Sequence, residues 1–343
     1  MIKKLFILLL IAIAAAAGGY FYIKNQIDIY ADQVITLTEP ETITIDAGSS
    51  FRSVLRQFES KGWVTPSPFI KLITRFRPEL KNVKAGTFMI QPDMSFSDAL
   101  IFISTGKEHQ FAITFVEGSR FSEWRSILSQ ADSLTHKTTD LTESDIADQL
   151  AIGSDLNSGI KKLEGLFLAE TYHYTAGMSD LDILARAHNN LNHVLDREWA
   201  NRQKDLPLKT PYEALILASI IEKETALESE RKTVASVFIN RLNRRMRLQT
   251  DPTVIYGMGD KYTGNIRKKD LKTPTPYNTY TINGLPPTPI AMAGEASIHA
   301  ALNPENTSYL YFVASGKGGH VFSKNLKQHN RAVQNYLREL RKK

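Results

Sequence analysis

Two glutamates, Glu222 and Glu224, are the residues whose type and position most suggest chemistry. They lie in the run PYEALILASIIEKETALESE (residues 211–230), whose apolar spacing predicts a helix. At about 100° per residue, Glu224 falls about 20° from Leu217, at the centre of the apolar face, whereas Glu222 falls about 140° away. A buried carboxylate is costly unless it is partnered or protonated, and burial raises its pKa. Glu224 therefore has the surroundings that a general acid needs near neutral pH, and Glu222 is the second choice.

A structural role for Glu224 is the alternative, in which a backbone donor or an arginine satisfies the buried carboxylate. Arg231 and Arg241 follow at a suitable distance along the chain and are the candidate partners. This alternative predicts a satisfied ion pair and no catalytic function for Glu224.

Two helices are expected to position these glutamates. Thr210 can act as N-cap of the first, Pro211 suits its first turn, and Glu213 completes a capping box. The run VASVFINRL (residues 234–242) predicts a second helix that ends in polar side chains.

The loops after these helices are rich in tyrosine, asparagine, glutamine and proline. They contain LQTDPTVIYG (248–257), YNTY (277–280), NGLPPTPI (283–290), LNPENTSYLYFV (302–313) and GKGGHVFS (316–323). Aromatic rings stack on the C–H faces of sugars, and amides pair with hydroxyl and N-acetyl groups. The pattern suits a carbohydrate ligand, unless these are rigid loops that only pack.

The N-terminus carries an uncharged run, LFILLLIAIAAAAGGYFYI (residues 5–23). At 1.5 Å per residue the run is about 28 Å long, close to the roughly 30 Å of a bilayer core. We expect a single-pass anchor with a cytoplasmic tip (residues 1–4) and all following residues exported, because Lys3 and Lys4 obey the positive-inside rule. A cleaved signal peptide with an A-x-A site in Ala14–Ala17 is the alternative.

Composition and missing motifs exclude several classes of protein. With no cysteine among 343 residues, neither disulfides nor thiol catalysis are available. No H-E-x-x-H or phosphate-binding G-x-x-x-x-G-K-[ST] pattern occurs, and the eight histidines are scattered, so we expect no metal and no cofactor. The net charge of +6 is too weak to indicate a nucleic-acid partner. The basic C-terminus (Arg338, Arg341, Lys342 and Lys343) suits a solvated helix end.

The exported chain is expected to divide into a linker (24–40), a small α+β module (41–110) and a catalytic domain (111–343). In the module the pattern predicts strands at 42–45 and 84–90 and helices at 51–58, 66–76 and 95–103. In the larger domain it predicts a strand at 111–115 and helices at 121–128 and 181–195, besides the two described above.

The segments ASIIEKET, VASVFINRL, LQTDPTVIYGMG, YNTY, GLPP and YLYFVASGKGGHVFS together resemble the YceG family of endolytic murein transglycosylases, which are anchored in the bacterial inner membrane. The phrase KAGTFMI in a strand–helix–helix–strand unit resembles a LysM-like module, which binds glycans; the alternative is a domain that only spaces the catalytic part from the membrane. The resemblance implies the α+β class, with one transmembrane helix, the LysM-like module and a mixed α/β catalytic domain with a lysozyme-like catalytic helix.

The resemblance also implies roles for single residues. The family's catalytic glutamate lies in an E-x-E-T segment, here Glu222–Thr225, and the glutamate directly before threonine favours Glu224. The implied substrate-binding residues are Thr225, Asn240, Gln249, Asp251, Tyr277, Asn278, Tyr280, Asn303 and His320. One departure is Ala169-Glu170-Thr171-Tyr172, where the family usually has Pro-Asp-Thr-Tyr; this segment is expected to be structural.

The implied reaction cleaves the β-1,4 bond between N-acetylmuramic acid and N-acetylglucosamine in nascent glycan strands. It leaves a 1,6-anhydromuramoyl end and would terminate strand elongation. Peptidoglycan, the inner membrane and penicillin-binding wall synthases are the expected partners. Two alternatives stay open: a tethered glycan-binding scaffold without catalysis, and a hydrolytic muramidase in which Asp251 supplies a second carboxylate. The Asp-Pro pair at that position otherwise suits a turn.

Overall fold

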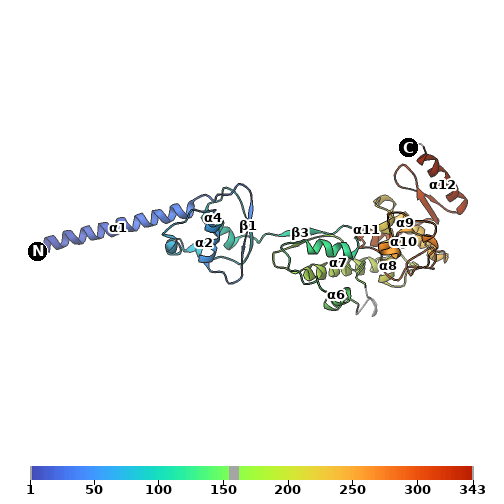
Figure 1. The fold of residues 1–343 in the computed structure, drawn as a ribbon, viewed down its shortest axis with the longest axis horizontal. Helices are drawn as coiled ribbons and strands as arrows, with labels where there is room; N and C mark the ends of the chain where they lie inside the picture. Colours follow the sequence, from blue (N-terminus) through green and yellow to red (C-terminus); the bar gives the residue numbers. More distant parts are fainter. Residues whose placement is uncertain (1, 154–161, 342–343) are drawn as a thin grey trace. The chain divides into compact units, whose positions relative to one another are not determined.

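The computed structural model describes residues 2–153 and 162–341. Met1 of the expected cytoplasmic tip, residues 154–161 of the expected catalytic domain and the last two lysines lie outside the described residues. The chain divides into two compact units, Met1–Phe111 and Ala112–Lys343. The order of their helices and strands is labelled in Figure 1. Both units mix helices with short antiparallel strands, so the fold is of the α+β type.

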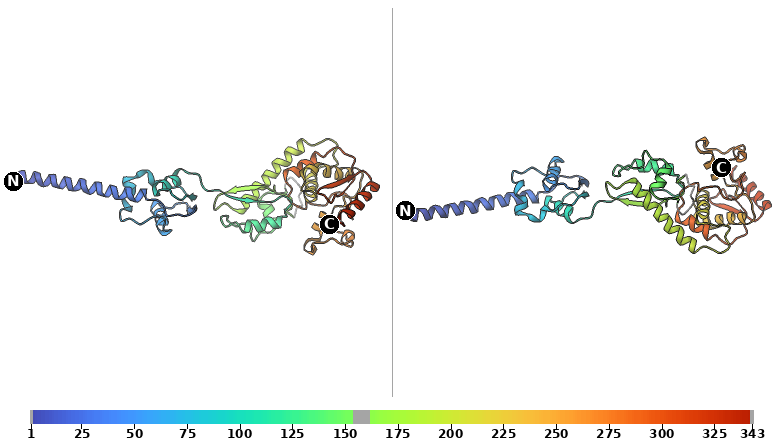
Figure 2. Two further views of the ribbon diagram at one scale, coloured as in Figure 1. Left: turned by 90° about the horizontal axis from the view of Figure 1, so that it is seen from above. Right: turned by 90° about the horizontal axis from the view of Figure 1, so that it is seen from below.

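The first unit begins with one long helix, α1 (Ile2–Asp32), which Figure 2 shows as continuous up to the small globular part of this unit. Among the described residues, α1 is the one helix long and apolar enough to cross a membrane. A single N-terminal helix of this kind fits the expected membrane anchor.

Residues 24–32 differ from the expected linker because they continue α1. Ile27, Tyr30 and Ala31 are buried in the core of the first unit. Their spacing places them on one face of the helix, so that side of α1 packs while the opposite side stays solvated. Lys24 and Asp28 add an ion pair four residues apart on the exposed surface. The polar composition of this segment indicated a linker, and the tertiary packing overrides that indication.

The rest of the first unit is small and mixed. It contains a two-stranded antiparallel sheet, in which Glu41 pairs with Ile90 and Ile45 with Gly86. Its elements are β1 (Glu41–Ile45), α2 (Phe51–Ser60), η1 (Ile70–Leu72), α3 (Ile73–Phe76), η2 (Pro78–Lys81), β2 (Gly86–Ile90) and α4 (Phe96–Thr105). Phe58, Phe88 and Phe96 form the centre of its core.

The expected helix at 66–76 forms only in its last part, as a short turn followed by α3. Pro66 and Pro68 lack the N–H groups that would extend a helix, and Pro78 disfavours the helical conformation of Arg77 before it. Arg77 accordingly leaves the helical region, with φ −128° and ψ 68°.

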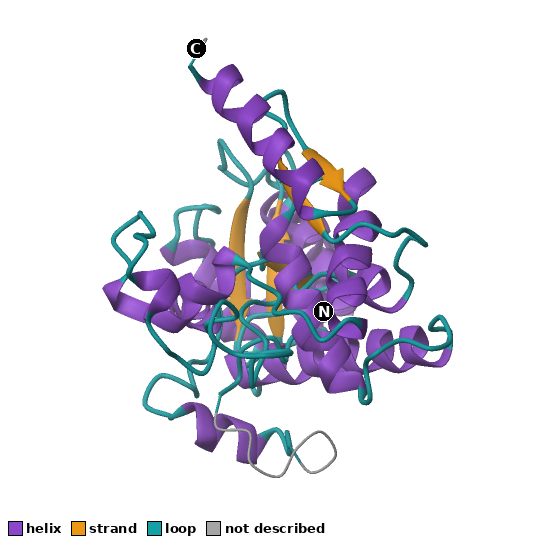
Figure 3. Cartoon of the chain, turned by 90° about the vertical axis from the view of Figure 1, so that its right-hand side faces the viewer, coloured by secondary structure: helices purple, strands orange, loops and turns teal. Residues whose placement is uncertain are grey.

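The second unit is mainly helical, as the predominance of helices over short strands in Figure 3 illustrates. Its strands are β3 (Phe111–Thr114), β4 (Thr171–Tyr174), β5 (Tyr311–Ala314) and β6 (His320–Ser323), paired β3 with β4 and β5 with β6. Its longer helices are α5 (Phe121–Ser129), α6 (Glu143–Gln149), α7 (Asp180–Ala200), α8 (Pro211–Glu224), α9 (Glu228–Asn243), α10 (Asp251–Met258), α11 (Glu295–Leu302) and α12 (Leu326–Leu340).

Helix α8 lies at the centre of the second unit and packs against α7, α9, α10 and α11. Every residue from Ala214 to Ile221 is buried. The single apolar face that the sequence indicated is therefore absent, because neighbours surround this helix on all sides.

The expected helix over 211–230 breaks at Thr225. This residue adopts an extended conformation (φ −145°, ψ 130°), and its hydroxyl accepts a hydrogen bond from the Leu227 N–H at 3.1 Å. Glu224 is thus the last residue of α8, and α9 begins at Glu228. The break places Glu224 at the C-terminal end of α8, before the turn that leads into α9.

Candidate active site

Glu224 opens onto a cavity of about 180 Å³ at the C-terminal end of α8. The lining comes from α8, α9, the loop before α10, the start of α10, the 280 region and β5. Besides Glu224, the lining residues are Phe238, Arg241, Leu248, Gln249, Asp251, Tyr280 and Phe312. The structure thus brings together Glu224, Gln249, Asp251 and Tyr280, four of the residues that the sequence singled out.

Thr250 is the direct hydrogen-bond partner of Glu224, because its hydroxyl donates to the Oε1 atom of the carboxyl group. A buried set of threonines fixes Thr250 in turn. Its backbone N–H donates to the Thr279 hydroxyl at 3.0 Å, and the Thr279 and Thr253 hydroxyls lie 2.8 Å apart. The carboxyl group of Glu224 is therefore held in one orientation by groups that are themselves rigidly placed.

Burial raises the pKa of Glu224, and the negative charge of Asp251 raises it further. The Thr250 hydrogen bond and the positive charges of His320 and Arg241 act in the opposite direction, but the net shift is upward. A carboxyl group in these surroundings keeps its proton closer to neutral pH than an exposed one. It can therefore donate that proton to a leaving group.

Asp251 and Tyr280 form a hydrogen-bonded pair beside Glu224. The Tyr280 hydroxyl donates to Asp251 Oδ1 at 2.6 Å. Burial raises the pKa of Tyr280, and its bond to Asp251 adds to the shift, so the phenol stays protonated as a donor. Asp251 is the first residue of α10, where the amino-terminal end of the helix favours a negative charge.

Arg241 is a buried cation in the wall of the cavity, and the sequence indicated it only as a partner for a structural Glu224. Its Nε atom donates to the Leu310 carbonyl at 2.6 Å. Its Nη1 atom donates to the carbonyls of Leu248 at 2.8 Å and Arg247 at 3.2 Å. Burial lowers the pKa of Arg241. This side chain joins α9 to the loop before α10 and to the segment before β5, so it shapes the cavity.

His320 on β6 is held by Glu230 of α9. Its Nδ1 atom lies 2.7 Å from Glu230 Oε2, and its backbone N–H donates to Glu230 Oε1 at 2.8 Å. The ring of His320 packs edge-on against Phe312, 5.2 Å between centroids, and Phe312 lines the cavity. His320 itself is not among the residues that line the cavity, and it adjoins the cavity through Phe312.

Glu222 has a different environment from Glu224. Its Oε2 atom accepts the Gly294 N–H at 3.0 Å, at the start of α11, and Oε1 lies 4.0 Å from Nη2 of Arg231. Only 6% of its side chain is exposed. Arg231 therefore lies opposite Glu222 rather than Glu224, so it is not the partner that the structural alternative requires for Glu224.

Asn278 and Asn240 hold loops together instead of facing the cavity. Asn278 is 1% exposed, and its amide donates to the carbonyls of Asp270, Leu271 and Thr273. The amide of Asn240 donates to the carbonyls of Thr307 and Tyr309, each at 3.0 Å. The donors of both amides are used by backbone carbonyls, and neither residue lines the cavity, so their contact with substrate stays a prediction.

Three other expected contact residues also lie outside the cavity lining. Thr225 is buried in the turn between α8 and α9. The Tyr277 hydroxyl is 2.9 Å from that of Thr288, and its ring packs on Tyr256. Asn303 ends α11, where its N–H donates to the His299 carbonyl. Their types suited a sugar, but each serves a local turn or packing contact.

The sequence argument missed Thr250, Phe238 and Phe312 as parts of the site. Thr250 stood between two residues that it did select, Gln249 and Asp251, within LQTDPTVIYG. A hydroxyl that can cap a carboxylate was a usable signal there. The two phenylalanines carried no such signal, because their apolar spacing is that of ordinary core residues. Within residues 2–153 and 162–341, no group of three or more His, Asp or Glu side chains is arranged to hold a metal ion.

Comparisons with known proteins place the chain among relatives along almost its full length. It matches the model of the YceG-like family over residues 43–335. A Bacillus subtilis (strain 168) relative, named endolytic murein transglycosylase, is 29% identical over 332 residues, which cover 93% of this chain and 90% of the relative. A relative of the same name from Streptococcus pneumoniae R6 is 26% identical, and the match covers 94% of this chain but 63% of that longer protein.

A crystal structure of a YceG-like protein from Listeria monocytogenes, at 2.6 Å resolution, has a similar fold. It matches with a TM-score of 0.56 and 32% sequence identity, over 86% of this chain and 99% of that one. Taken with the family match over most of the chain, these similarities show that the chain belongs to the YceG-like family.

Proposed function

We propose that this chain is an endolytic peptidoglycan lytic transglycosylase, which cuts nascent glycan strands and so terminates their elongation. One observation carries the proposal: Glu224, a carboxyl group with a raised pKa, is fixed by Thr250 at the wall of a cavity. The relatives named endolytic murein transglycosylase point to the substrate class.

In the first proposed step, Glu224 donates its proton to the oxygen of the β-1,4 bond between N-acetylmuramic acid and N-acetylglucosamine. The bond from C1 to that oxygen breaks, and the muramoyl ring develops oxocarbenium character. Burial favours this step because the neutral carboxyl group is the form that a poorly solvated site prefers.

In the second proposed step, the muramoyl C6 hydroxyl attacks C1, and the Glu224 carboxylate takes the hydroxyl proton. Glu224 loses one proton in the first step and regains one in the second, so the protons balance. No water is consumed. One acid/base group suffices since the nucleophile belongs to the substrate. Gln249, Asp251, Tyr280 and His320 are the proposed contacts to substrate hydroxyl, N-acetyl and lactyl groups around this centre.

The remaining parts have proposed roles that follow from their positions in the chain. Helix α1 would cross the inner membrane once, with Lys3 and Lys4 in the cytoplasm and both folded units outside. The unit before residue 111 would be the LysM-like module that contacts glycan, and wall synthases would be neighbouring partners. Lys3 and Lys4 before the apolar run support this orientation.

The experiment that tests the reaction is product analysis. The full chain in detergent is incubated with purified murein, and the new glycan ends are identified by mass spectrometry. Anhydromuramoyl ends without incorporation of ¹⁸O from labelled water are the expected result. Reducing muramoyl ends carrying ¹⁸O would instead identify a muramidase, with Asp251 beside Glu224 as its second carboxylate. No new ends would favour the scaffold.

Asp251→Asn is expected to move the alkaline limb of the kcat/KM profile to lower pH, by roughly half a unit to one unit. The Asp251 charge raises the pKa of Glu224, so its removal lets the acid lose its proton at lower pH. Initial rates of anhydro-end formation across pH give the measurement. Tyr280→Phe is the matched control, because it removes the bond to Asp251 but keeps the charge. An unmoved limb in Asp251→Asn would show that this charge does not act on the acid.

His320→Ala is expected to lower kcat/KM by about 10- to 100-fold, mainly through KM, because it removes a proposed substrate contact and not the acid. Glu230→Gln should cause a smaller loss, since the amide oxygen can still accept the His320 backbone N–H while the amide N–H meets Nδ1 of the other histidine tautomer. Steady-state kinetics on a defined glycan measure both. An equal loss in kcat with unchanged KM would contradict the assignment of His320 to substrate binding.

A further inference from the structure

The C-terminal helix α12 carries an apolar stripe that no described element covers. Leu326, Val333, Leu337 and Leu340 fall within about 60° of one another around the helix axis. Of these, Leu326 is 55% exposed, Leu337 40% and Leu340 46%. Ala332 is the one buried residue of α12 among those described. A row of exposed apolar side chains along one side of a surface helix is typical of an interaction surface.

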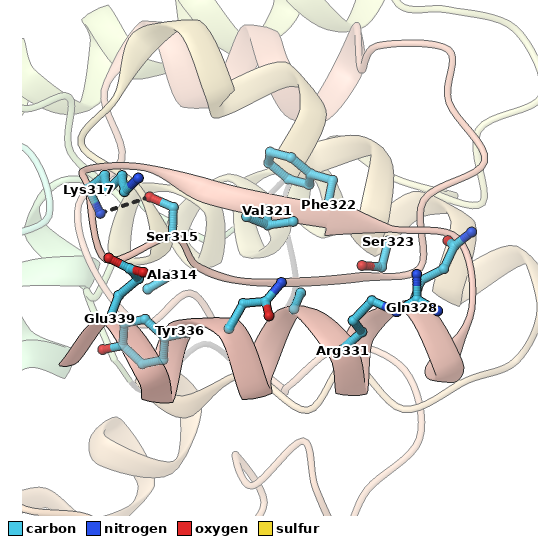
Figure 4. A pocket seen from close by; sticks show the side chains of 12 residues that line it. Ala314, Ser315, Lys317, Val321, Phe322, Ser323, Gln328, Arg331, Tyr336 and Glu339 are labelled. Carbon is cyan, nitrogen blue, oxygen red and sulfur yellow. Dashed lines mark hydrogen bonds between the residues drawn. The ribbon is translucent and has the colours of Figure 1, made fainter. Parts of the chain in front are cut away.

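Another side of α12 packs against the β5–β6 hairpin. Tyr311 of β5 stacks on His329, with ring centroids 5.1 Å apart. Figure 4 shows Gln328, Arg331 and Tyr336 on the side of α12 that faces the hairpin, across a groove. The hairpin thus covers the side of α12 next to the leucine stripe, since His329 falls about 60° from Leu326 around the helix. The leucines of the stripe stay 40–55% exposed beside it.

Basic side chains border the stripe on its other edge. Lys327, Arg338 and Arg341 are all exposed, and they fall between about 60° and 120° from Leu326 around the helix. Glu339, the acidic residue of α12, lies instead on the hairpin side, close to Ala314 and Lys317 in Figure 4. One face of the helix is thus apolar with a cationic border.

We propose that this face of α12 docks on an anionic lipid surface. The leucines would enter the boundary between headgroups and acyl chains, and the border would contact lipid phosphates. A second copy of the chain is a poor occupant, because two cationic borders would meet. A glycan offers little apolar surface for leucines. A bilayer is the surface that α1, with its membrane-spanning length, gives this chain.

Because the chain contains no cysteine, a thiol-reactive label attaches only to a cysteine that is introduced by substitution. Leu337→Cys in the full chain is labelled with an environment-sensitive fluorophore and placed in nanodiscs, either of phosphatidylcholine alone or with phosphatidylglycerol. We expect a blue shift and quenching by brominated lipid in the anionic discs only, weakened at about 1 M salt, where the screening length falls to about 3 Å. Asn335→Cys, on the hairpin side two residues away, is the matched control and should stay unquenched.

Reversing the charge of two side chains in the basic border tests the electrostatic contribution to lipid binding. Lys327→Glu with Arg338→Glu changes two exposed side chains, so folding should persist, and quenching of the label at position 337 should fall several-fold. Equal quenching at both label positions, or none in anionic discs, would overturn the proposal. A blue shift that grows with protein concentration in detergent would show self-association and would overturn it too. The readout does not depend on murein cleavage, so it stands or fails separately from the proposed reaction.

Discussion

Glu224→Gln is expected to lower the rate of anhydro-end formation by about 10²–10⁴-fold, the usual contribution of a general acid/base group. The amide keeps the size and the hydrogen-bonding capacity of the side chain at Thr250 but cannot donate an acidic proton. Binding of murein should persist, because the cavity walls are unchanged. Initial rates and murein co-sedimentation, measured on the same preparations, separate the two properties.

Glu222→Gln is the matched control, because it makes the same chemical change two residues earlier in α8. Its amide oxygen can still accept the Gly294 N–H, while the charge opposite Arg231 is lost. We expect a lower melting temperature with activity retained. If Glu222→Gln were inactive and Glu224→Gln active, the assignment within the E-x-E-T segment would be reversed.

The stability of Glu224→Gln carries a second signature. The pKa of Glu224 is raised in the folded state, so the wild type loses stability as pH rises from the unfolded-state pKa through the folded-state pKa. Gln does not titrate. Below about pH 4 the variant should therefore have the same melting temperature as the wild type. At about pH 8 its melting temperature should be higher than that of the wild type. A variant less stable than wild type at the higher pH would mean that the charged carboxylate is favoured in the fold.

Arg241→Met is expected to destabilise the second unit by about 3–5 kcal/mol, the usual cost of breaking a buried polar network. Methionine retains much of the packing volume but removes the donors to the carbonyls of Leu310, Leu248 and Arg247. Two buried acceptors, the carbonyls of Leu310 and Leu248, and the part-buried carbonyl of Arg247 then lose their partner. In a unit of this size the melting temperature should fall by about 10 °C, measured by calorimetry.

Arg244→Met is the control for this change, because Arg244 is exposed at the end of the same helix. It should change the melting temperature by no more than about 2 °C. Arg241→Lys should fall between the two, since one ammonium cannot reach all the carbonyls that Nε and Nη1 of the arginine serve separately. Unfolding of Arg241→Met at the wild-type temperature would show that these hydrogen bonds add nothing to stability.

Local patterns predicted most of the secondary structure. The capping pattern at Thr210 and Pro211 marks the start of α8, and Ser95 and Gly106 border α4 as expected. These capping interactions join residues within one turn of helix. The neighbouring residues in the sequence therefore suffice to predict them. The segment from Lys24 to Asp32 escaped prediction because its helix depends on a core assembled from distant residues.

Glu224 lines the cavity and its catalytic role stays a prediction, but one premise of the argument for it was wrong. Periodicity placed it on an apolar face, whereas α8 is enclosed on all sides and ends at this residue. What distinguishes Glu224 from Glu222 is the partner of each. Thr250, 26 residues onward, meets Glu224, while Gly294, 72 residues onward, meets Glu222. No local spacing encodes such contacts.

By itself the sequence determined the apolar N-terminal run, the positions of most helices, and the motifs by which the chain resembles its family. These follow from side-chain type and short-range periodicity. Only the tertiary structure decided which polar groups face the cavity and which hold loops, as Asn278 and Arg241 illustrate. The physical reason is that a polar side chain either meets a ligand or satisfies the backbone, and the packing of distant loops determines which groups lie within hydrogen-bonding distance.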